Sequence, residues 1–235
     1  MTDLDGRVIA IAGAGGSLGP VVAQRLAGAG ASLALADRSQ EIADGVAEGL
    51  GLPDDRIDPR AVDLIDESQA DAWAAGAVEK FGRVDGLLHL VGGYRGGDPI
   101  DSFDLSDYEF LHALLVRSLQ LTTRAFHSSL ASSDHGRFVL VSAAAAQSPE
   151  STNAAYASTK AAAEAWTLAL ADSFHGTNAT SNIIVINAIE TGRMRDDRGT
   201  SNPAFTPVED LADAIAFLCS DSAARMNGQR LSMHP

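Results

Sequence analysis

The sequence is poor in cysteine and in lysine, and each shortage excludes a class of protein. Its 235 residues include one cysteine, Cys219, so the chain has no internal disulfide framework and no cysteine-based zinc site. A single cysteine fits the reducing cytoplasm, where we expect this protein to work. Lysine is confined to Lys80 and Lys160, and 17 basic residues face 31 acidic ones. The net charge of -14 repels phosphate backbones and anionic bilayers, so we expect neither a nucleic-acid nor a membrane partner.

Long apolar runs are also missing. The N-terminal residues are acidic, whereas a secretory signal is basic, and no apolar stretch approaches the length of roughly 20 residues that spans a bilayer. What the chain does contain is 46% hydrophobic and 20% charged residues, which is enough apolar material for a substantial core. The length suits one large α/β domain, and we expect residues 1–235 to form a single domain.

Short β-branched runs alternate with longer amphipathic runs along the chain. This alternation predicts a mostly parallel sheet with helices on both faces. The expected strands are 7–12, 32–36, 58–62, 84–91, 137–142, 181–187 and 230–233. The expected helices are 18–29, 39–50, 67–81, 106–130, 154–174 and 207–219. Ser39 is the expected N-cap of the second helix, and Ser106 with Glu109 forms an expected capping box.

A glycine-rich loop follows the first expected strand and leads directly into a helix. It reads Ala12-Gly-Ala-Gly-Gly-Ser-Leu-Gly19, and Pro20 stands in the first helical turn, where its missing N–H costs little. Glycines let the backbone approach a pyrophosphate, whose charge the helix N-terminus stabilises. Asp37 ends the next strand, where a ribose-binding carboxylate is expected. The pattern predicts a dinucleotide site, and a tight turn beside an exposed acid is the alternative.

The residues around Asp37 bear on which dinucleotide binds. A carboxylate there accepts hydrogen bonds from ribose hydroxyls and repels a 2′-phosphate, which favours NAD. Arg38 follows immediately and offers a partner for a 2′-phosphate, so NADP remains the alternative. Asp63, after the third expected strand, is either a partner of the adenine amino group or a solvated loop acid.

The segment Tyr156-Ala-Ser-Thr-Lys160 stands at the start of a long expected helix, where residues four apart share a face. With the glycine loop, this segment resembles the short-chain dehydrogenase/reductase family over essentially the whole chain. The Y-x-x-x-K motif is intact, whereas Ala12 and Ser17 replace a threonine and a glycine of the family's loop T-G-x-x-x-G-x-G. The resemblance implies a Rossmann-type doubly wound α/β fold, with a seven-stranded parallel sheet and helices on both faces.

The paired tyrosine and lysine suit hydride transfer between a nicotinamide and a carbonyl carbon, because a proton must then reach or leave the oxygen. A phenol has an ordinary pKa of about 10, and an ammonium group one turn away favours the phenolate. We therefore expect Tyr156 to be the general acid/base, with Lys160 lowering its pKa. The resemblance adds that Lys160 binds the nicotinamide ribose. A helix-surface pair without function is the alternative.

The chain departs from the family at the serine that holds the substrate oxygen. That serine stands thirteen residues before the tyrosine in the family, and Ala143 occupies the position here. Ser142 is the expected substitute, provided that the strand end bulges or twists, because adjacent strand residues point to opposite faces. Ser148 in the following loop is a looser candidate. The expected catalytic set is Tyr156, Lys160 and Ser142.

A second departure concerns the family's helix asparagine. Leu115 takes its place when Tyr108 is matched to the usual tryptophan. His89 and His112 are candidates to replace the lost polar group, although a packed or interfacial histidine is the commoner role. The family's loop residues N-N-A-G and P-G read 89–92 and 191–192 here, and the terminal V-D-G-G is replaced.

The resemblance carries an expected cofactor set onto this chain. Its members are Gly13, Gly16, Ser17, Leu18, Gly19, Asp37, Arg38, Asp63, Leu64, Val91, Gly92, Tyr156, Lys160, Thr191 and Gly192. No histidine and carboxylate cluster suggests a metal. Arg193, Arg195 and Arg198 lie where the family has its substrate lid. They either attract an anionic substrate or balance Asp196 and Asp197 in a solvated loop.

The expected function is oxidation of a small-molecule alcohol or reduction of a carbonyl compound with NAD, or alternatively NADP, as cofactor. Because Ala143 and Leu115 weaken the usual site, a nucleotide-binding sensor or partner subunit without turnover is the rival, and a lyase or isomerase is a third possibility. Family members pair through two long helices, so we expect a homodimer or homotetramer formed by segments 106–130 and 154–174.

Overall fold

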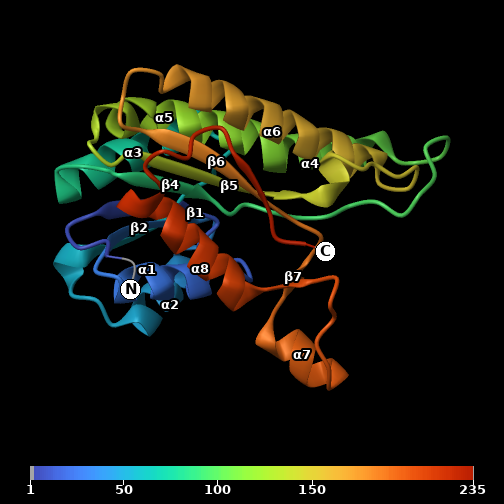
Figure 1. The fold of residues 1–235 in the computed structure, drawn as a ribbon, viewed down its shortest axis with the longest axis horizontal. Coiled ribbons are helices and arrows are strands. Elements are labelled where there is room, and N and C mark those ends of the chain that lie inside the picture. Colours follow the sequence, from blue (N-terminus) through green and yellow to red (C-terminus); the bar gives the residue numbers. More distant parts are fainter. Residues whose placement is uncertain (1–2, 235) are drawn as a thin grey trace.

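Seven parallel strands form the main sheet in the computed structural model, which describes residues 3–234 (Figure 1). In chain order they are β1 (Val8–Ala12), β2 (Ser32–Asp37), β3 (Ile57–Ala61), β4 (Gly86–His89), β5 (Arg137–Ala143), β6 (Thr180–Ile186) and β9 (Arg230–Ser232). Their order across the sheet is β3-β2-β1-β4-β5-β6-β9, so the direction of winding reverses between β1 and β4. This doubly wound, seven-stranded parallel sheet is the fold class predicted from the sequence.

Helices cover both faces of the sheet. The helices of the first face are α1 (Gly19–Gly28), α2 (Gln40–Leu50) and α8 (Val208–Cys219). Those of the second face are α3 (Glu67–Phe81), α5 (Ser118–Ser132) and α6 (Ala154–Ser173). Short 3₁₀ turns occupy Asp54–Arg56, Ala144–Ala146 and Asp221–Ala223. Neither face of the sheet is left to solvent, as is usual for a parallel sheet.

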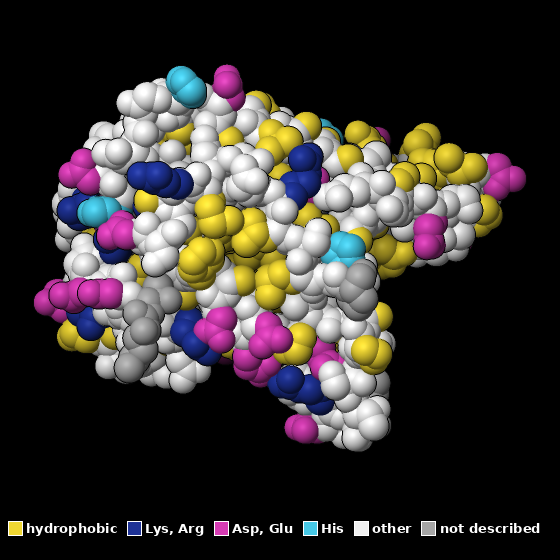
Figure 2. Space-filling model, in the orientation of Figure 1, with side chains coloured by type: hydrophobic (Ala, Val, Ile, Leu, Met, Phe, Trp, Pro, Cys, Tyr) yellow, Lys and Arg dark blue, Asp and Glu magenta, His cyan; other side chains and the backbone are white. Residues whose placement is uncertain are grey.

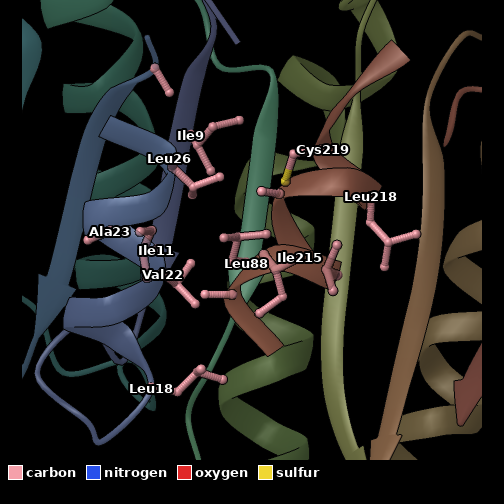
Figure 3. Packing of buried hydrophobic residues seen from close by; sticks show 14 of the residues in the cluster. Ile9, Ile11, Leu18, Val22, Ala23, Leu26, Leu88, Ile215, Leu218 and Cys219 are labelled. Atoms are coloured by element: carbon pink, nitrogen blue, oxygen red, sulfur yellow. The ribbon is translucent and has the colours of Figure 1, made fainter. Parts of the chain in front are cut away.

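Alternation along each strand divides the core into two layers. In β1, Ile9 and Ile11 pack against α1 and α8, whereas Val8 points to the layer under α3, α5 and α6. Figure 3 shows the first layer, in which Val22 of α1 and Ile215 of α8 face the strands. Because strands of this kind are buried on both sides, they read in the sequence as nearly continuous apolar runs.

The expected helix 106–130 is divided. It comprises α4 (Leu105–His112), a π-helical turn at Ala113–Arg117, and α5. The hydroxyls of Ser118 and Thr122 donate to the carbonyls of Leu114 and Ser118, four residues earlier, and such back-bonding competes with the regular helical ladder. Turns of the π type inside α-helices are frequently found at functional sites.

The N-cap at Ser39 is confirmed, since its hydroxyl accepts the N–H of Ile42 at 3.3 Å. The capping box at Ser106 is wrong: the helix begins one residue earlier, and Asp104 is the cap, accepting the Ser106 N–H at 2.8 Å. A carboxylate at this position also interacts favourably with the helix dipole, which a serine hydroxyl cannot match.

Two small elements were not expected from the sequence. A two-stranded parallel sheet joins β7 (Ile189–Glu190) to β8 (Thr206–Pro207), and α7 (Gly192–Arg198) lies between them. In Figure 1, α7 and the segment between β4 and α4 both project from the body of the molecule. The surface in Figure 2 is hollowed between these projections, and hydrophobic side chains gather on the upper one. No helix in residues 3–234 is long and apolar enough to cross a membrane.

Candidate active site

Two adjoining clefts lie where the strands end, at the reversal between β1 and β4. The first has a volume of about 350 Å³ and the second about 600 Å³. Both are bordered by Gly16, Leu90, Val91 and Gly92, so they share the wall formed by the loops after β1 and β4. Ligands of doubly wound sheets bind at this reversal.

The glycine-rich loop is shaped by close backbone contacts. Gly13 has a φ of 81°, and a Cβ atom there would stand 3.0 Å from the backbone N of Val91. A Cβ on Gly19 would overlap the carbonyl of Ala14. Glycine is therefore required at both positions for the loop to turn tightly and begin α1, which points its free N–H groups at this edge of the sheet.

Asp37 lies at the end of β2 and folds back onto the glycine loop. Its Oδ2 accepts the N–H of Gly15 at 3.0 Å and its Oδ1 accepts the N–H of Ser39 at 3.4 Å. Both oxygens retain further lone pairs, so the carboxylate can still accept ribose hydroxyls. Of the other expected cofactor residues, the first cleft is bordered by Gly13, Gly16, Arg38, Asp63, Leu64, Val91 and Gly92.

The second cleft brings the tyrosine and lysine of α6 together. Tyr156 is half-buried and Lys160 is buried, and the lysine Nζ lies 5.9 Å from the centre of the tyrosine ring. Nζ donates a hydrogen bond of 2.9 Å to the carbonyl of Val141 on β5. Ser17 and Leu18 of the glycine loop border the same cleft. Residues from the first and fifth expected helices, 18–29 and 154–174, thus border one cavity.

The electrostatics of this pair differ from expectation. Burial raises the pKa of Tyr156 to about 12, with a smaller contribution from the neighbouring phenol of Tyr94. Burial also lowers the pKa of Lys160 to about 8, which Glu164 opposes. The expected lowering of the tyrosine pKa by Lys160 is therefore wrong for this arrangement: the ammonium is directed at the Val141 carbonyl, and loss of water around the phenol dominates.

Ser142 does not present a hydroxyl to the cleft. It borders the cavity but is only 1% exposed, and its Oγ donates a hydrogen bond of 2.7 Å to Glu164 Oε1. Ala143 comes next, borders the cavity as well, and carries no polar group. The bulge that Ser142 would need is absent, because β5 pairs with β6 in unbroken register through Ala143. This orientation contradicts the expectation that Ser142 replaces the missing serine.

The two histidines lie outside both clefts. His89 is 1% exposed, and its ring nitrogens lie 3.2 Å from Ser118 Oγ and 3.3 Å from Thr122 Oγ1. Burial, with a smaller contribution from Lys160, lowers its pKa to about 3, so it is a neutral packed side chain. His112 is exposed and stacks obliquely on Tyr108.

Several polar groups of the second cleft were not singled out from the sequence. Tyr94 meets Tyr156 edge to face, with ring centres 5.1 Å apart, and it is 61% exposed. Asn153 and Asn187 also border the cavity. The signal for Tyr94 was its place among four glycines, 92–93 and 96–97, in a loop directly after a strand.

Leu115 occupies the place of the family's asparagine as a core residue. It is 2% exposed and packs in a small cluster with Leu111 and Ala155, against which Tyr156 also lies. The apolar side chain of Leu115 therefore belongs to the cluster that packs against Tyr156 and offers no hydrogen bond.

The segment of the expected substrate lid forms α7, near but not lining the clefts. Thr191 caps this helix, accepting the Met194 N–H at 3.3 Å, and neither it nor Gly192 borders a cavity described above. Arg193 lies 3.9 Å from Asp197, and Arg195 donates to Glu209 at 2.9 Å. These exposed ion pairs favour the solvated-loop interpretation. The side chain of Arg198 lies outside the described part of the chain.

The residues present fit a dinucleotide. The tight glycine turn leaves the backbone at Gly13 and Gly16 accessible to a pyrophosphate. Asp37 lies beside this loop, where a ribose would bind, and the adjoining cleft extends to Tyr156 and Lys160. Among residues 3–234, no group of three or more His, Cys, Asp or Glu side chains is placed to hold a metal ion. The fold and the glycine loop are those of the doubly wound α/β proteins that bind nucleotides. In this chain a tyrosine and a lysine border the cleft next to the nucleotide site.

Comparison with known proteins narrows that class. A family model described as enoyl-(acyl carrier protein) reductase matches residues 13–234. The 7alpha-hydroxysteroid dehydrogenase of Escherichia coli (strain K12) is 28% identical over 240 residues, covering 98% of this chain and 93% of that protein. The chain belongs to the short-chain dehydrogenase/reductase family, which is a family of oxidoreductases, and this confirms the enzyme class expected from the sequence.

Solved structures agree with this assignment. A short-chain dehydrogenase/reductase of the glucose/ribitol dehydrogenase type from Brucella melitensis has a TM-score of 0.86 and 26% identity, covering 99% of this chain and 97% of that one. A 3-ketoacyl-(acyl-carrier-protein) reductase from the same organism, solved in complex with NADH, has a TM-score of 0.84 and 27% identity, covering 98% of each chain.

Proposed function

We propose that this protein interconverts an alcohol and a carbonyl compound by NAD(H)-dependent hydride transfer, with Tyr156 as the general acid/base. The observation that carries the proposal is the pair of adjoining clefts: Tyr156 and Lys160 border the second cleft, which shares Gly16 of the glycine loop with the first cleft, where Asp37 lies. A proton donor and a dinucleotide cradle in one continuous site are what this reaction requires.

The cofactor would lie across both clefts, with the backbone of Gly13 and Gly16 against its pyrophosphate and Asp37 on its adenosine ribose. Two observations favour NAD over NADP. Asp37 is fixed by two backbone N–H groups, which holds its negative charge where a 2′-phosphate would stand. Asp63 borders the same cleft and adds a second acid. Arg38 offers the opposing attraction.

A bound nicotinamide supplies or accepts the hydride. In reduction, the Tyr156 hydroxyl donates its proton to the oxygen that becomes the alcohol, and in oxidation the phenolate takes that proton back. Lys160 would hold the nicotinamide ribose, and its ammonium group lies near the phenol ring. The apolar cluster around Leu115 packs against the tyrosine ring and shields the part of the ring that it covers from water.

The substrate that suits this cleft is uncharged. In the described part of the chain, Lys160 is the one ionic side chain that borders the second cleft, and the other lining groups are mainly apolar or neutral polar. A charged substrate would therefore find no counter-charge away from the reacting centre. Tyr94, Asn153 and Asn187 are the groups available to orient a neutral ketone or alcohol.

The remaining expectations belong to the same proposal. Residues 1–235 act as a single dinucleotide-binding domain, and two or four copies associate through α5 and the alanine-rich α6. A groove bordered by Arg124, Trp166 and Leu170 lies between those helices and leaves apolar surface for a partner copy. Cytoplasmic location is supported by the single buried thiol of Cys219.

The test is a panel of neutral alcohols and ketones, followed by the absorbance of reduced nicotinamide. Tyr156→Phe keeps the ring and removes the proton, so turnover should fall by about 10²–10⁴-fold while NADH affinity barely changes. Tyr108→Phe, on the exposed face of α4, is the matched control and should leave turnover unchanged. Tight NADH binding without turnover on any substrate would favour a sensor or partner subunit instead.

A further inference from the structure

A buried carboxylate lies one helical turn beyond the site lysine. Glu164 is 3% exposed. Its Oε1 accepts the hydroxyl of Ser142 at 2.7 Å, and its Oε2 accepts Nε of Arg230, on the edge strand β9, at 2.6 Å. Gln147 Nε2 lies 3.5 Å from the same oxygen. Burying a carboxylate is costly unless its lone pairs and charge are compensated, and here both are.

Lys160 and Glu164 share one face of α6 and bind consecutive residues of β5. The lysine donates to the carbonyl of Val141, whereas the glutamate accepts from the side chain of Ser142. In the described part of the chain, that carbonyl is the hydrogen-bond partner of Lys160 Nζ. A buried ammonium with one neutral partner needs a nearby negative charge to remain protonated. Burial lowers the pKa of Lys160 to about 8, and Glu164 acts against this lowering.

The other groups that face the lysine add no negative charge near neutrality. His89 on β4 is neutral because its pKa is lowered to about 3. Tyr156 on α6 remains a neutral phenol because its pKa is raised to about 12, and Tyr94 is a second phenol beside it. Arg230, 40% exposed, shares the Glu164 carboxylate and offsets part of its charge.

We propose that Glu164 is a positioning residue that keeps Lys160 in its ammonium form, and that Arg230 on β9 limits this effect by pairing with the same carboxylate. The inference rests on the proposed role of Lys160 in the nicotinamide site. Glu164 and Arg230 lie outside the clefts, and through them the edge strand β9 influences the charge of Lys160.

The chain allows a direct measurement because it has only two lysines, Lys80 and Lys160. With ¹³C-labelled lysine, two Cε resonances report the two side chains across a pH titration, and Lys160→Arg assigns them. The Lys160 signal of the unmodified protein should titrate near pH 8. Lys80 lies on α3 and is the internal control, whose titration should not differ between variants.

Two variants should move the Lys160 signal in opposite directions. Glu164→Gln removes the negative charge but keeps a carbonyl oxygen for Ser142, so the midpoint should fall. Arg230→Gln frees the carboxylate from its competing cation, so the midpoint should rise. Glu164→Asp keeps the charge and should stay closer to the unmodified protein than Glu164→Gln. A merely structural network would not give shifts of opposite sign. Equal midpoints in all folded variants, or shifts in the same direction, would overturn the proposal.

Binding of NADH provides the second readout. At about pH 8, Glu164→Gln should bind NADH on the order of threefold to tenfold more weakly than the unmodified protein. At about pH 6 the difference should be small, because Lys160 is then protonated in both proteins. Asp172→Asn, an exposed acid of α6, removes the same charge at a distance and should change neither readout. Absence of NADH binding by the unmodified protein would refute the proposed function, whereas the lysine titration would still decide the role of Glu164.

Discussion

The hydroxyl of Ser142 is donated to the carboxylate of Glu164, and the residue that follows it into the cleft is Ala143. The Ser142 hydroxyl therefore binds the buried carboxylate of Glu164, which also pairs with Arg230, and the cleft lacks the hydroxyl that the family places there. A substrate oxygen bound beside Tyr156, as proposed above, would have one fewer hydrogen-bond donor than in the family.

Restoring the hydroxyl at 143 should raise the reaction rate. Ala143→Ser would place a donor where negative charge develops on the oxygen, and one such donor is commonly worth about 10²–10³ in rate, or roughly 3–4 kcal/mol. Steady-state rates on a small neutral ketone at fixed NADH would measure the gain. Ala145→Ser, at another position on the same cleft, is the control and should give no comparable gain. A gain below tenfold with NADH still bound would mean that the cleft has been reshaped around another donor, for which Tyr94 is placed.

Restoring the family's asparagine at position 115 should lower the stability of the protein. Leu115 is 2% exposed and packs against Leu111 and Ala155, so Leu115→Asn buries an amide in an apolar cluster. We expect a loss of about 1–3 kcal/mol in the free energy of unfolding, measured by urea denaturation. Leu115→Met conserves volume and should cost less than about 1.5 kcal/mol. Equal stability of Leu115→Asn and the unmodified protein would show that the amide finds a partner.

Most of the fold is predictable from the sequence because each parallel strand is buried on both faces. The runs ending at Ala12 and Asp37 are apolar, bounded by turn residues, and fall within a residue or two of the observed strands. The division of the long helix before α5 was not predictable by periodicity, because it depends on where the hydroxyls of Ser118 and Thr122 find carbonyl partners.

For the candidate site, local patterns indicated the glycine loop, Asp37 and the paired Tyr156 and Lys160. They could not show that burial would raise the pKa of Tyr156 and outweigh any lowering by the Lys160 ammonium, since burial depends on tertiary packing. The contribution of Tyr94 depends on how the projecting segment after β4 packs against the residues just before α6, where the Gly97 N–H donates to the Thr152 carbonyl at 2.8 Å. Contacts of this kind join distant segments and leave no periodic signal.

The pKa values predict different pH dependence for the two directions of reaction. Burial raises the pKa of Tyr156 to about 12, so the neutral phenol needed for reduction predominates at ordinary pH. The phenolate needed for oxidation is scarce there and becomes about tenfold more abundant for each unit of rising pH. Oxidation should therefore accelerate from about pH 6 to 8, whereas reduction should stay nearly level. The measurement is kcat/KM in each direction, which reports the pKa values of groups in the free enzyme. Oxidation that is independent of pH would assign proton transfer to another group.

Cofactor choice is the most direct test of the first cleft. Asp37 is held on the glycine loop by the N–H groups of Gly15 and Ser39, so its charge cannot easily move away from a 2′-phosphate. The unmodified protein should bind NADH more tightly than NADPH in titration calorimetry. Asp37→Ala removes the repulsion and leaves Arg38 as a partner for phosphate, so NADPH affinity should rise relative to NADH, on the order of tenfold or more.

The control for this comparison is Asp172→Asn, which changes the net charge equally but lies far along α6 from the glycine loop. It should leave the ratio of the two affinities unchanged. Asp37→Asn distinguishes charge from hydrogen bonding, because the amide oxygen still accepts one N–H while the repulsion is gone. If the unmodified protein binds NADPH as tightly as NADH, Arg38 outweighs Asp37 at this site, and the preference for NAD is wrong. If Asp37→Ala weakens both cofactors equally, the carboxylate acts through the shape of the loop, because its charge then has no differential effect on the 2′-phosphate.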